Sequence, residues 1–250
     1  MTLQEKIVLR LFLFCILLTP FVIGIHYAVF PEETKCILVD WTNLENKDRI
    51  YYSEISSEKE IDSLQVLIDS AALRVANFWG EKTCNPKYIY LKDKTDYAGY
   101  CPSGAPAATY LKLGSYIVLS SDAVNIDIIA HEISHAEFFE RIGFSRWTYD
   151  IPSWFKHGLA MQNDYREGYS EEQLKLVTKD MQDIPEIKDF IYDLAFYSGT
   201  EEEVALHYML AKQEVKKWYS PQKLKQLIAD LNASKKFKDA FGYDAGIIQK

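Results

Sequence analysis

Two histidines and a glutamate lie within five residues of one another in the segment His131-Glu132-Ile133-Ser134-His135. On a helix, side chains at positions i and i+4 project from one face one turn apart, so both imidazoles can bind one metal ion. Neutral imidazole is a common zinc ligand, and a catalytic zinc site has three protein ligands with water in the fourth position. A neighbouring carboxylate can take the proton of that water. We therefore predict a Zn²⁺ site that includes His131 and His135, with Glu132 as the general base.

The third ligand has to come from another part of the chain. Only His157 and His207 remain among the histidines that follow the apolar N-terminus. His157 lies in the segment Pro152 to Ala160, which reads as a helix that could pack antiparallel beside the motif helix. We predict that His157 is the third ligand. The alternative is that it is an ordinary histidine on a helix surface.

The motif helix is expected to run from Val124 to Arg141 and to stop at Gly143, after possible N-caps at Ser120 to Asp122. An amphipathic helix is expected from Ser57 to Trp79, with Gly80 as its C-cap. Short apolar runs predict strands at Lys35 to Trp41, Tyr88 to Leu91 and Tyr116 to Leu119. Further helices are expected at 152–164, 170–181, 201–218 and 221–231. The pattern predicts an α+β fold, a small, mostly antiparallel sheet packed against a helical bundle.

An apolar segment precedes this domain. Leu11 to Phe30 is a run of 20 residues without Asp, Glu, Lys or Arg, which is long enough to cross ~30 Å of hydrocarbon as a helix. Lys6 and Arg10 precede the run, whereas acidic residues follow it, so the charge bias places the domain on the extracytoplasmic side, periplasmic or extracellular. We expect residues 1–34 to form a cytoplasmic stub and a single-pass signal anchor, and residues 35–250 to form the domain. A cleaved signal peptide and a buried core helix are the alternatives.

Composition narrows the class of protein. With 48% hydrophobic and 14% aromatic residues, the chain can bury a sizeable core. A net charge of −8 argues against nucleic acid as a partner, because phosphate binding needs clustered Lys and Arg. Three cysteines fall in the domain; Cys84 and Cys101 could form a disulfide and leave Cys36 free.

The order of these segments resembles that of the gluzincin-type peptidases with an HExxH motif (peptidase MA-like), in particular small, often membrane-anchored domains in which Trp-x-x-Glu-Gly-Leu-Ala follows the active-site helix. The resemblance covers about residues 85 to 243. It rests on Ile117-Val118-Leu119-Ser120, on Ala130 to His135, on Trp154-Phe155-Lys156-His157-Gly158-Leu159-Ala160, and on the tail with Tyr219-Ser220-Pro221-Gln222-Lys223-Leu224. It implies a zincin-like fold. It also implies that the strand before the helix is an edge strand, so that Tyr116, Ile117, Val118 and Leu119 would bind an extended peptide substrate. A donor to the oxyanion is expected too, and Tyr208, His207 or Tyr197 could provide it.

One position departs from that family, which has a glutamate where this chain has His157. Three neutral ligands leave the formal charge of the site at +2 rather than +1, which should make the bound water more acidic. We therefore expect His157→Glu to shift the acidic limb of the pH–rate profile to higher pH. An unshifted limb would count against this reasoning. The His157-Gly158 pair is also similar to the SprT-like metallopeptidases, but their association with DNA fits poorly with an acidic, anchored chain.

The sequence thus favours a membrane-anchored zinc metallopeptidase, a hydrolase that cleaves a peptide or protein substrate by means of a Glu-activated, zinc-bound water. The rival interpretation is a catalytically inactive metallopeptidase-like domain that acts as an extracytoplasmic protein-binding module. The third histidine favours the rival, whereas Glu132 favours the enzyme, because a purely structural zinc site needs no base.

Overall fold

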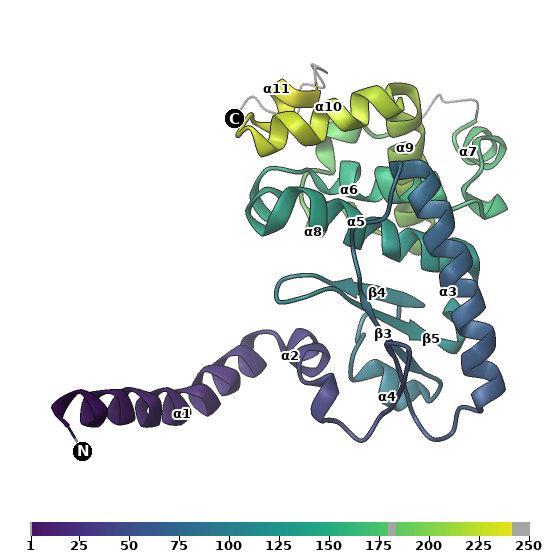
Figure 1. The fold of residues 1–250 in the computed structure, drawn as a ribbon. Helices are drawn as coiled ribbons and strands as arrows, with labels where there is room; N and C mark the ends of the chain where they lie inside the picture. Colours follow the sequence, from purple (N-terminus) through teal and green to yellow (C-terminus); the bar gives the residue numbers. More distant parts are fainter. Residues whose placement is uncertain (1, 180–183, 242–250) are drawn as a thin grey trace.

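A five-stranded sheet forms the base of the domain (Figure 1). The structure is a computed structural model that describes residues 2–179 and 184–241. The strand order is β1-β2-β3-β5-β4. The strands are β1 (Glu45–Lys47), β2 (Ile50–Tyr52), β3 (Lys87–Leu91), β4 (Ala107–Tyr110) and β5 (Tyr116–Ser120).

The sheet is mixed, so the prediction of a mostly antiparallel sheet is wrong. Strand β3 is parallel to both β2 and β5, whereas β1–β2 and β4–β5 are antiparallel pairs. The reason is the long helix α3 (Glu58–Trp79) between β2 and β3, because a helical crossover returns the chain in the same direction. The predicted α+β class, with helices packed on a small sheet, is confirmed.

Helices cover both faces of the sheet, as the alternation of its side chains requires. On β5, Ile117 and Leu119 face a core shared with α3 and with α5 (Ile126–Tyr149). Tyr116 and Val118 face a second cluster, which also contains Cys36 from α2 (Pro31–Ile37) and Tyr97 from α4 (Lys94–Ala98).

The predicted strand at Lys35 to Trp41 is wrong. This segment forms the end of α2 and a 3-10 turn, Val39–Trp41. Pro31 occupies the first turn of α2, where its fixed φ favours a helix. Cys36 and Val39 are both buried, and their i, i+3 spacing suits one helical face rather than a strand.

Helix α5 carries the histidine motif and begins after the N-cap Asn125, later than expected. Gly143 has φ 75° and ψ 168°, so the helix is interrupted there, as predicted, but it resumes as far as Tyr149. The first part of α5 packs on α3 and the sheet, whereas Phe138 and Ile142 belong to a separate core formed by the C-terminal helices.

The C-terminal half is helical, as predicted. It contains α6 (Ser153–Ala160), α7 (Glu171–Val177), α8 (Asp193–Phe196), α9 (Glu201–Trp218), α10 (Pro221–Asn232), α11 (Phe237–Phe241) and the 3-10 turns 161–163, 167–169 and 187–189. The predicted helix 152–164 is shorter, because Pro152 is the N-cap of α6 and a 3-10 turn follows Ala160. The predicted helix 170–181 ends at Val177, and residues 180–183 lie outside the described part of the chain.

Helices α6 and α9 touch at Gly158. A Cβ atom built on Gly158 would lie 2.4 Å from the carbonyl oxygen of Ala211 and 2.7 Å from Cγ2 of Val215. Such contacts are closer than van der Waals packing allows, so only glycine permits this approach of the two helices. The contact therefore fixes α6, and with it His157.

We expect Gly158→Ala to lower the free energy of unfolding by about 1–3 kcal/mol, because overpacking forces α6 away from α9. Denaturant unfolding measures this change. Gly168→Ala is the matched control, since a Cβ at Gly168 meets nothing within 4 Å. If the two variants were equally stable, Gly158 would not be needed for the helix contact.

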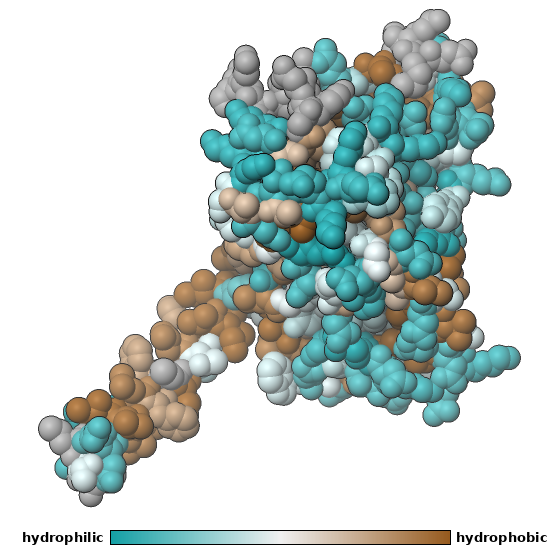
Figure 2. Space-filling model, turned by 45° about the horizontal axis from the view of Figure 1, so that its top comes forward, coloured by the Kyte–Doolittle hydropathy of each residue, from teal (hydrophilic) through white to brown (hydrophobic). Residues whose placement is uncertain are grey.

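Helix α1 (Leu3–Val29) projects from the domain (Figure 1), and none of its described side chains is buried in the core. Its most apolar stretch of 18 residues has a mean hydropathy of 2.5 and is 0% buried. Figure 2 shows the apolar surface of α1 beside a mostly hydrophilic domain. Among the described residues it is the one helix long and apolar enough, by length and composition, to span a membrane. The alternative of a buried core helix is wrong.

The disulfide between Cys84 and Cys101 that the sequence left possible is not formed. Cys36, Cys84 and Cys101 are free and buried within the described part of the chain. Cys84 lies in the core between α3 and α5, whereas Cys101 lies with Cys36 in the cluster on the opposite face of the sheet. The sheet therefore separates the sulfurs of Cys84 and Cys101.

Candidate metal centre

The three predicted histidine ligands converge at one place. His131 and His135 come from α5 and His157 from α6, and all three are buried. One nitrogen from each lies within 4.8 Å of the others, close enough to bind a metal ion. The Nε2 atoms of His131 and His135 are 3.1 Å apart. Two ligands of a tetrahedral zinc, each ~2.0–2.1 Å from it, would be ~3.3 Å apart.

The imidazoles are in the charge state that metal binding needs. Burial, with additional repulsion from neighbouring histidines and cations, lowers the pKa of His131, His135 and His157 well below 6.5. They are therefore neutral at pH 7. In addition, the Nδ1 atom of each has no hydrogen-bond partner among the described residues.

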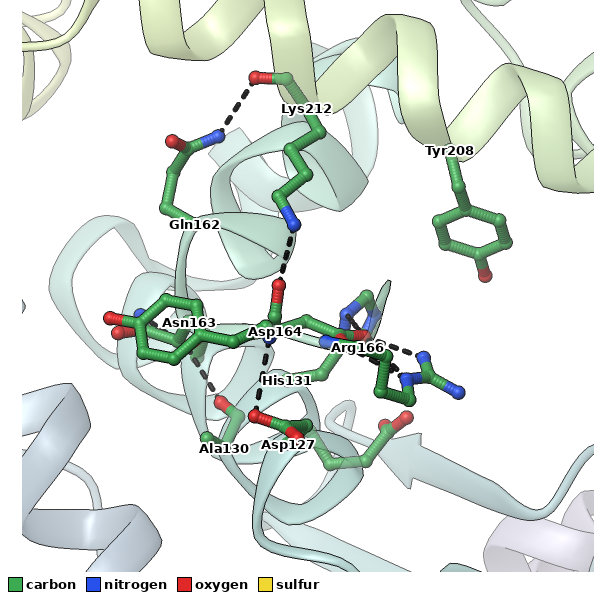
Figure 3. A network of polar contacts seen from close by, with 12 residues as sticks. Asp127, Ala130, His131, Gln162, Asn163, Asp164, Arg166, Tyr208 and Lys212 are labelled. Atoms are coloured by element: carbon green, nitrogen blue, oxygen red, sulfur yellow. Dashed lines mark hydrogen bonds and ion pairs between the residues drawn. The ribbon is translucent and has the colours of Figure 1, made fainter. Parts of the chain in front are cut away.

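A buried carboxylate, Asp164, lies beside His131 (Figure 3). Its side chain is 0% exposed, and its Oδ2 is 3.9 Å from Nδ1 of His131. Arg166 donates to both carboxylate oxygens, from Nε and from Nη2. Carboxylates next to metal-binding histidines orient the ring and raise its basicity. Sequence reasoning missed Asp164, because it follows α6 in an irregular segment with no motif.

Three helices hold the segment that contains Asp164. Nζ of Lys212 on α9 donates to the carbonyl oxygen of Asp164 at 2.6 Å, and Nη1 of Arg74 on α3 donates to that of Asn163 at 2.9 Å. The side-chain amide of Asn163 donates from Nδ2 to Oγ of Ser134 on α5 at 2.9 Å. The position of the carboxylate is thus set by tertiary contacts.

Glu132 is partly buried and lies on α5 between His131 and His135. Its carboxylate accepts a hydrogen bond from the hydroxyl of Thr109 on β4. Burial raises the pKa of Glu132 to about 7, against the opposing effect of the Thr109 hydrogen bond. The carboxyl therefore titrates near neutral pH, as suits a group that takes up and releases a proton. Thr109 also escaped sequence reasoning, since β4 itself was not predicted.

Two tyrosines complete the site. The hydroxyl of Tyr197 lies 3.0 Å from Nε2 of His157, and the hydroxyl of Tyr208 donates to that of Tyr197 at 3.3 Å. Burial raises the pKa of both hydroxyls, so they stay protonated and can act as donors. His207 lies elsewhere, with Nδ1 2.7 Å from the carbonyl oxygen of Phe196. Of the three suggested donors, only the tyrosines reach the histidine cluster.

The free edge of the sheet is not where we expected it. β5 lies between β3 and β4, so Tyr116, Ile117, Val118 and Leu119 have neighbours on both sides, and all four are buried. The prediction that this strand is an edge is wrong, because β4, which precedes β5 in the chain, forms an antiparallel pair with the side of β5 that faces away from β3. Among the described residues β1 and β4 are the edge strands, and β4 is the one whose Thr109 contacts Glu132.

No family model matches this chain, and a search of curated proteins finds no match either. The resemblance to gluzincins therefore rests on the residues of this chain alone. The structure adds a cluster of three buried histidines that can hold a metal ion.

Proposed function

We propose that this protein is a membrane-anchored, zinc-dependent metallopeptidase with His131, His135 and His157 as ligands and Glu132 as the base. The observation that carries the proposal is the convergence of three neutral, buried imidazoles, two of them on the helix that also carries Glu132, whose carboxylate accepts a hydrogen bond from Thr109 of β4. A site that only stabilised the fold would need no carboxylate beside the fourth position. An all-nitrogen set of three ligands suits zinc better than Mg²⁺ or Ca²⁺, which prefer oxygen.

Zinc, when bound, would polarise the peptide carbonyl and lower the pKa of water. Glu132 would take a proton from the attacking water and deliver it to the leaving amine. Thr109 would hold the carboxylate of Glu132 in place. Tyr208 would turn its hydroxyl proton from Tyr197 to the oxygen that becomes negative in the transition state.

The substrate would lie along β4. An edge strand has unpaired main-chain groups that can bind an extended peptide. β4 is also adjacent to Glu132 through Thr109, so a peptide added to this edge would pass the base. A substrate on β4 takes the place of the substrate site that we predicted on β5.

Helix α1 would anchor the domain at the extracytoplasmic face. Lys6 and Arg10 near the start of α1 favour the cytoplasm, whereas Glu32 and Glu33 follow its end. The substrates would then be peptides or proteins on the same side of the membrane.

Metal analysis of the purified chain tests the proposal. We expect one zinc per wild-type chain and less than one in His157→Ala, with His207→Gln, another buried histidine, as the matched control. We also expect the wild type to cleave an unfolded protein. This cleavage should cease when a chelator removes the metal and should return when Zn²⁺ is added. A well-folded chain that binds no zinc would overturn the proposal.

A binding module with a zinc site is the second candidate. The contact between the Tyr197 hydroxyl and Nε2 of His157 favours it, because the hydroxyl competes with a metal ion for the nitrogen of the third ligand that the enzyme would need. Stoichiometric zinc without cleavage of any peptide would support this candidate over the enzyme.

We expect Asp164→Asn to weaken zinc binding by about 10- to 100-fold, since the carboxylate beside His131 would lose its charge. Competition with a chromophoric chelator measures the affinity. Asp150→Asn is the control, because Asp150 pairs with Arg146 and has no contact with the histidines. Equal affinities in the two variants would mean that Asp164 only stabilises its own segment.

A further inference from the structure

A cavity of about 330 Å³ lies at the junction between α1 and the domain. It is far from the histidine cluster in the sequence, and no part of the proposed chemistry uses it. The residues that line it are Tyr27, Lys35, Leu38, Trp41, Thr42 and Tyr100.

The cavity has a fixed relation to the end of α1. Nδ1 of His26 on α1 lies 2.6 Å from the hydroxyl of Thr34 on α2, which in turn donates to the carbonyl oxygen of Phe30. Lys112 lies 3.6 Å over the ring of Phe30 and pairs with Glu33 at 3.1 Å. These contacts join α1, α2 and the β4–β5 connection.

If α1 spans a bilayer, this junction lies at the level where the membrane meets water. The charge-free run of α1 ends at Phe30, and Tyr27 precedes that end by three residues, or ~4.5 Å of helix. Figure 2 shows the apolar surface of α1 giving way to hydrophilic residues where it joins the domain. If α1 spans the bilayer, the cavity therefore opens among the lipid headgroups.

The chemistry of the lining suits that level. Trp41 is 77% exposed and Tyr27 is 49% exposed, and such amphipathic rings are enriched at the membrane–water interface. The ammonium group of Lys35 donates to the carbonyl oxygen of Gly99 at 2.5 Å and lies 5.8 Å from the ring of Tyr100. An ammonium has three donors, so it can bind a further acceptor.

Two acidic residues near the cavity have other cationic partners. Asp40 pairs with Lys87 at 2.6 Å, and Glu33 pairs with Lys112. Neither carboxylate lines the cavity. Lys35 is thus the cation that the cavity presents to an incoming ligand.

We infer that this cavity binds the headgroup of a membrane phospholipid, with the phosphate on Lys35 and the glycerol region between Tyr27 and Trp41. The inference rests on the membrane-spanning α1 of the proposed function, but not on zinc or on peptide hydrolysis. Bound in this way, a lipid would fix the height and tilt of the domain above the bilayer.

Tryptophan fluorescence of the full chain in nanodiscs tests the position of the cavity. Trp41 is the one exposed tryptophan of the five, so the difference between wild type and Trp41→Phe isolates its emission. We expect a phosphatidylcholine with a spin label on its headgroup to quench this difference signal, and iodide in the buffer to quench it weakly. Strong quenching by iodide without quenching by the labelled lipid would overturn the inference.

Lipid retention tests the binding itself. We expect native mass spectrometry to find phosphatidylglycerol on the detergent-purified full chain, with retention about fivefold lower in Lys35→Gln than in wild type. Lys47→Gln, at an exposed lysine paired with Asp62, should retain lipid like the wild type. Equal retention in the two variants would overturn the role of Lys35.

Carbonate extraction of membranes separates the two failures. If the chain stays in the membrane but Trp41 is not quenched by the labelled lipid, the inferred lipid site is wrong and the proposed anchor stands. If carbonate releases the chain, both the anchor and the lipid site are wrong. Zinc content and peptide cleavage report on the metal centre independently of both results.

Discussion

Replacing Glu132 with glutamine is expected to lower kcat for peptide hydrolysis by about 10²- to 10⁴-fold, the usual contribution of a general base. Glutamine keeps the shape of the side chain and can still contact Thr109, but it cannot accept the proton of the attacking water. None of the three proposed ligands changes, so the zinc content should stay at the wild-type value. Cleavage of a fluorogenic peptide and elemental analysis of the same samples measure the two quantities.

Glu140→Gln is the matched control for this experiment, because Glu140 is an exposed residue on the same helix, α5. It should retain both zinc and activity. Full activity in Glu132→Gln would assign the base to another group. Loss of zinc in that variant would mean that Glu132 supports the metal centre rather than the proton transfer.

Replacing Glu137 with alanine is expected to lower the free energy of unfolding by about 3 kcal/mol, because one partner of a buried ion pair is lost. Glu137 is 0% exposed and pairs with Arg141 at 2.7 Å. Its carboxylate also accepts hydrogen bonds from the backbone of Thr83 and Cys84. Glu137 therefore ties the segment before β3 to the helix that carries His131 and His135. Urea unfolding at pH 7 measures the change.

The pH dependence of this contribution has a definite sign. Burial alone would raise the pKa of Glu137, but the hydrogen bonds from Cys84 and Thr83 outweigh burial and lower it from 4.5. A carboxylate with a lowered pKa in the folded state stabilises the fold above its unfolded pKa and loses that effect as pH falls through the folded value. The gap between wild type and Glu137→Ala should therefore narrow below pH 4.5. A gap that is constant with pH, or an equal loss in Glu140→Ala, would contradict this account.

Local signals predicted much of the secondary structure. The expected helix from Ser57 to Trp79 is α3, because Ser57 and Glu60 form a capping box and Gly80 ends the helix at φ 86°. α9 has the predicted bounds, 201–218. The spacing of His131 and His135 sufficed to place both nitrogens together, since four residues make about one helical turn.

Long-range packing explains what the sequence did not reveal. β1 and β2 have three residues each, too few to show an alternating pattern. The edge position of β4 depends on which strands pair, and pairing is not encoded in any one segment. Asp164 reaches His131 only because contacts from α3, α5 and α9 hold its irregular segment, so no spacing rule could have identified it.

The division of the domain into two cores has a consequence for cooperativity. His131 and His135 stand on the part of α5 that packs on the sheet, whereas His157 belongs to a helix of the C-terminal core. An ion held by all three would act as a cross-link between the two halves. Its binding energy would then be shared by both, so that the loaded chain melts as a single unit and the metal-free halves are free to open in turn.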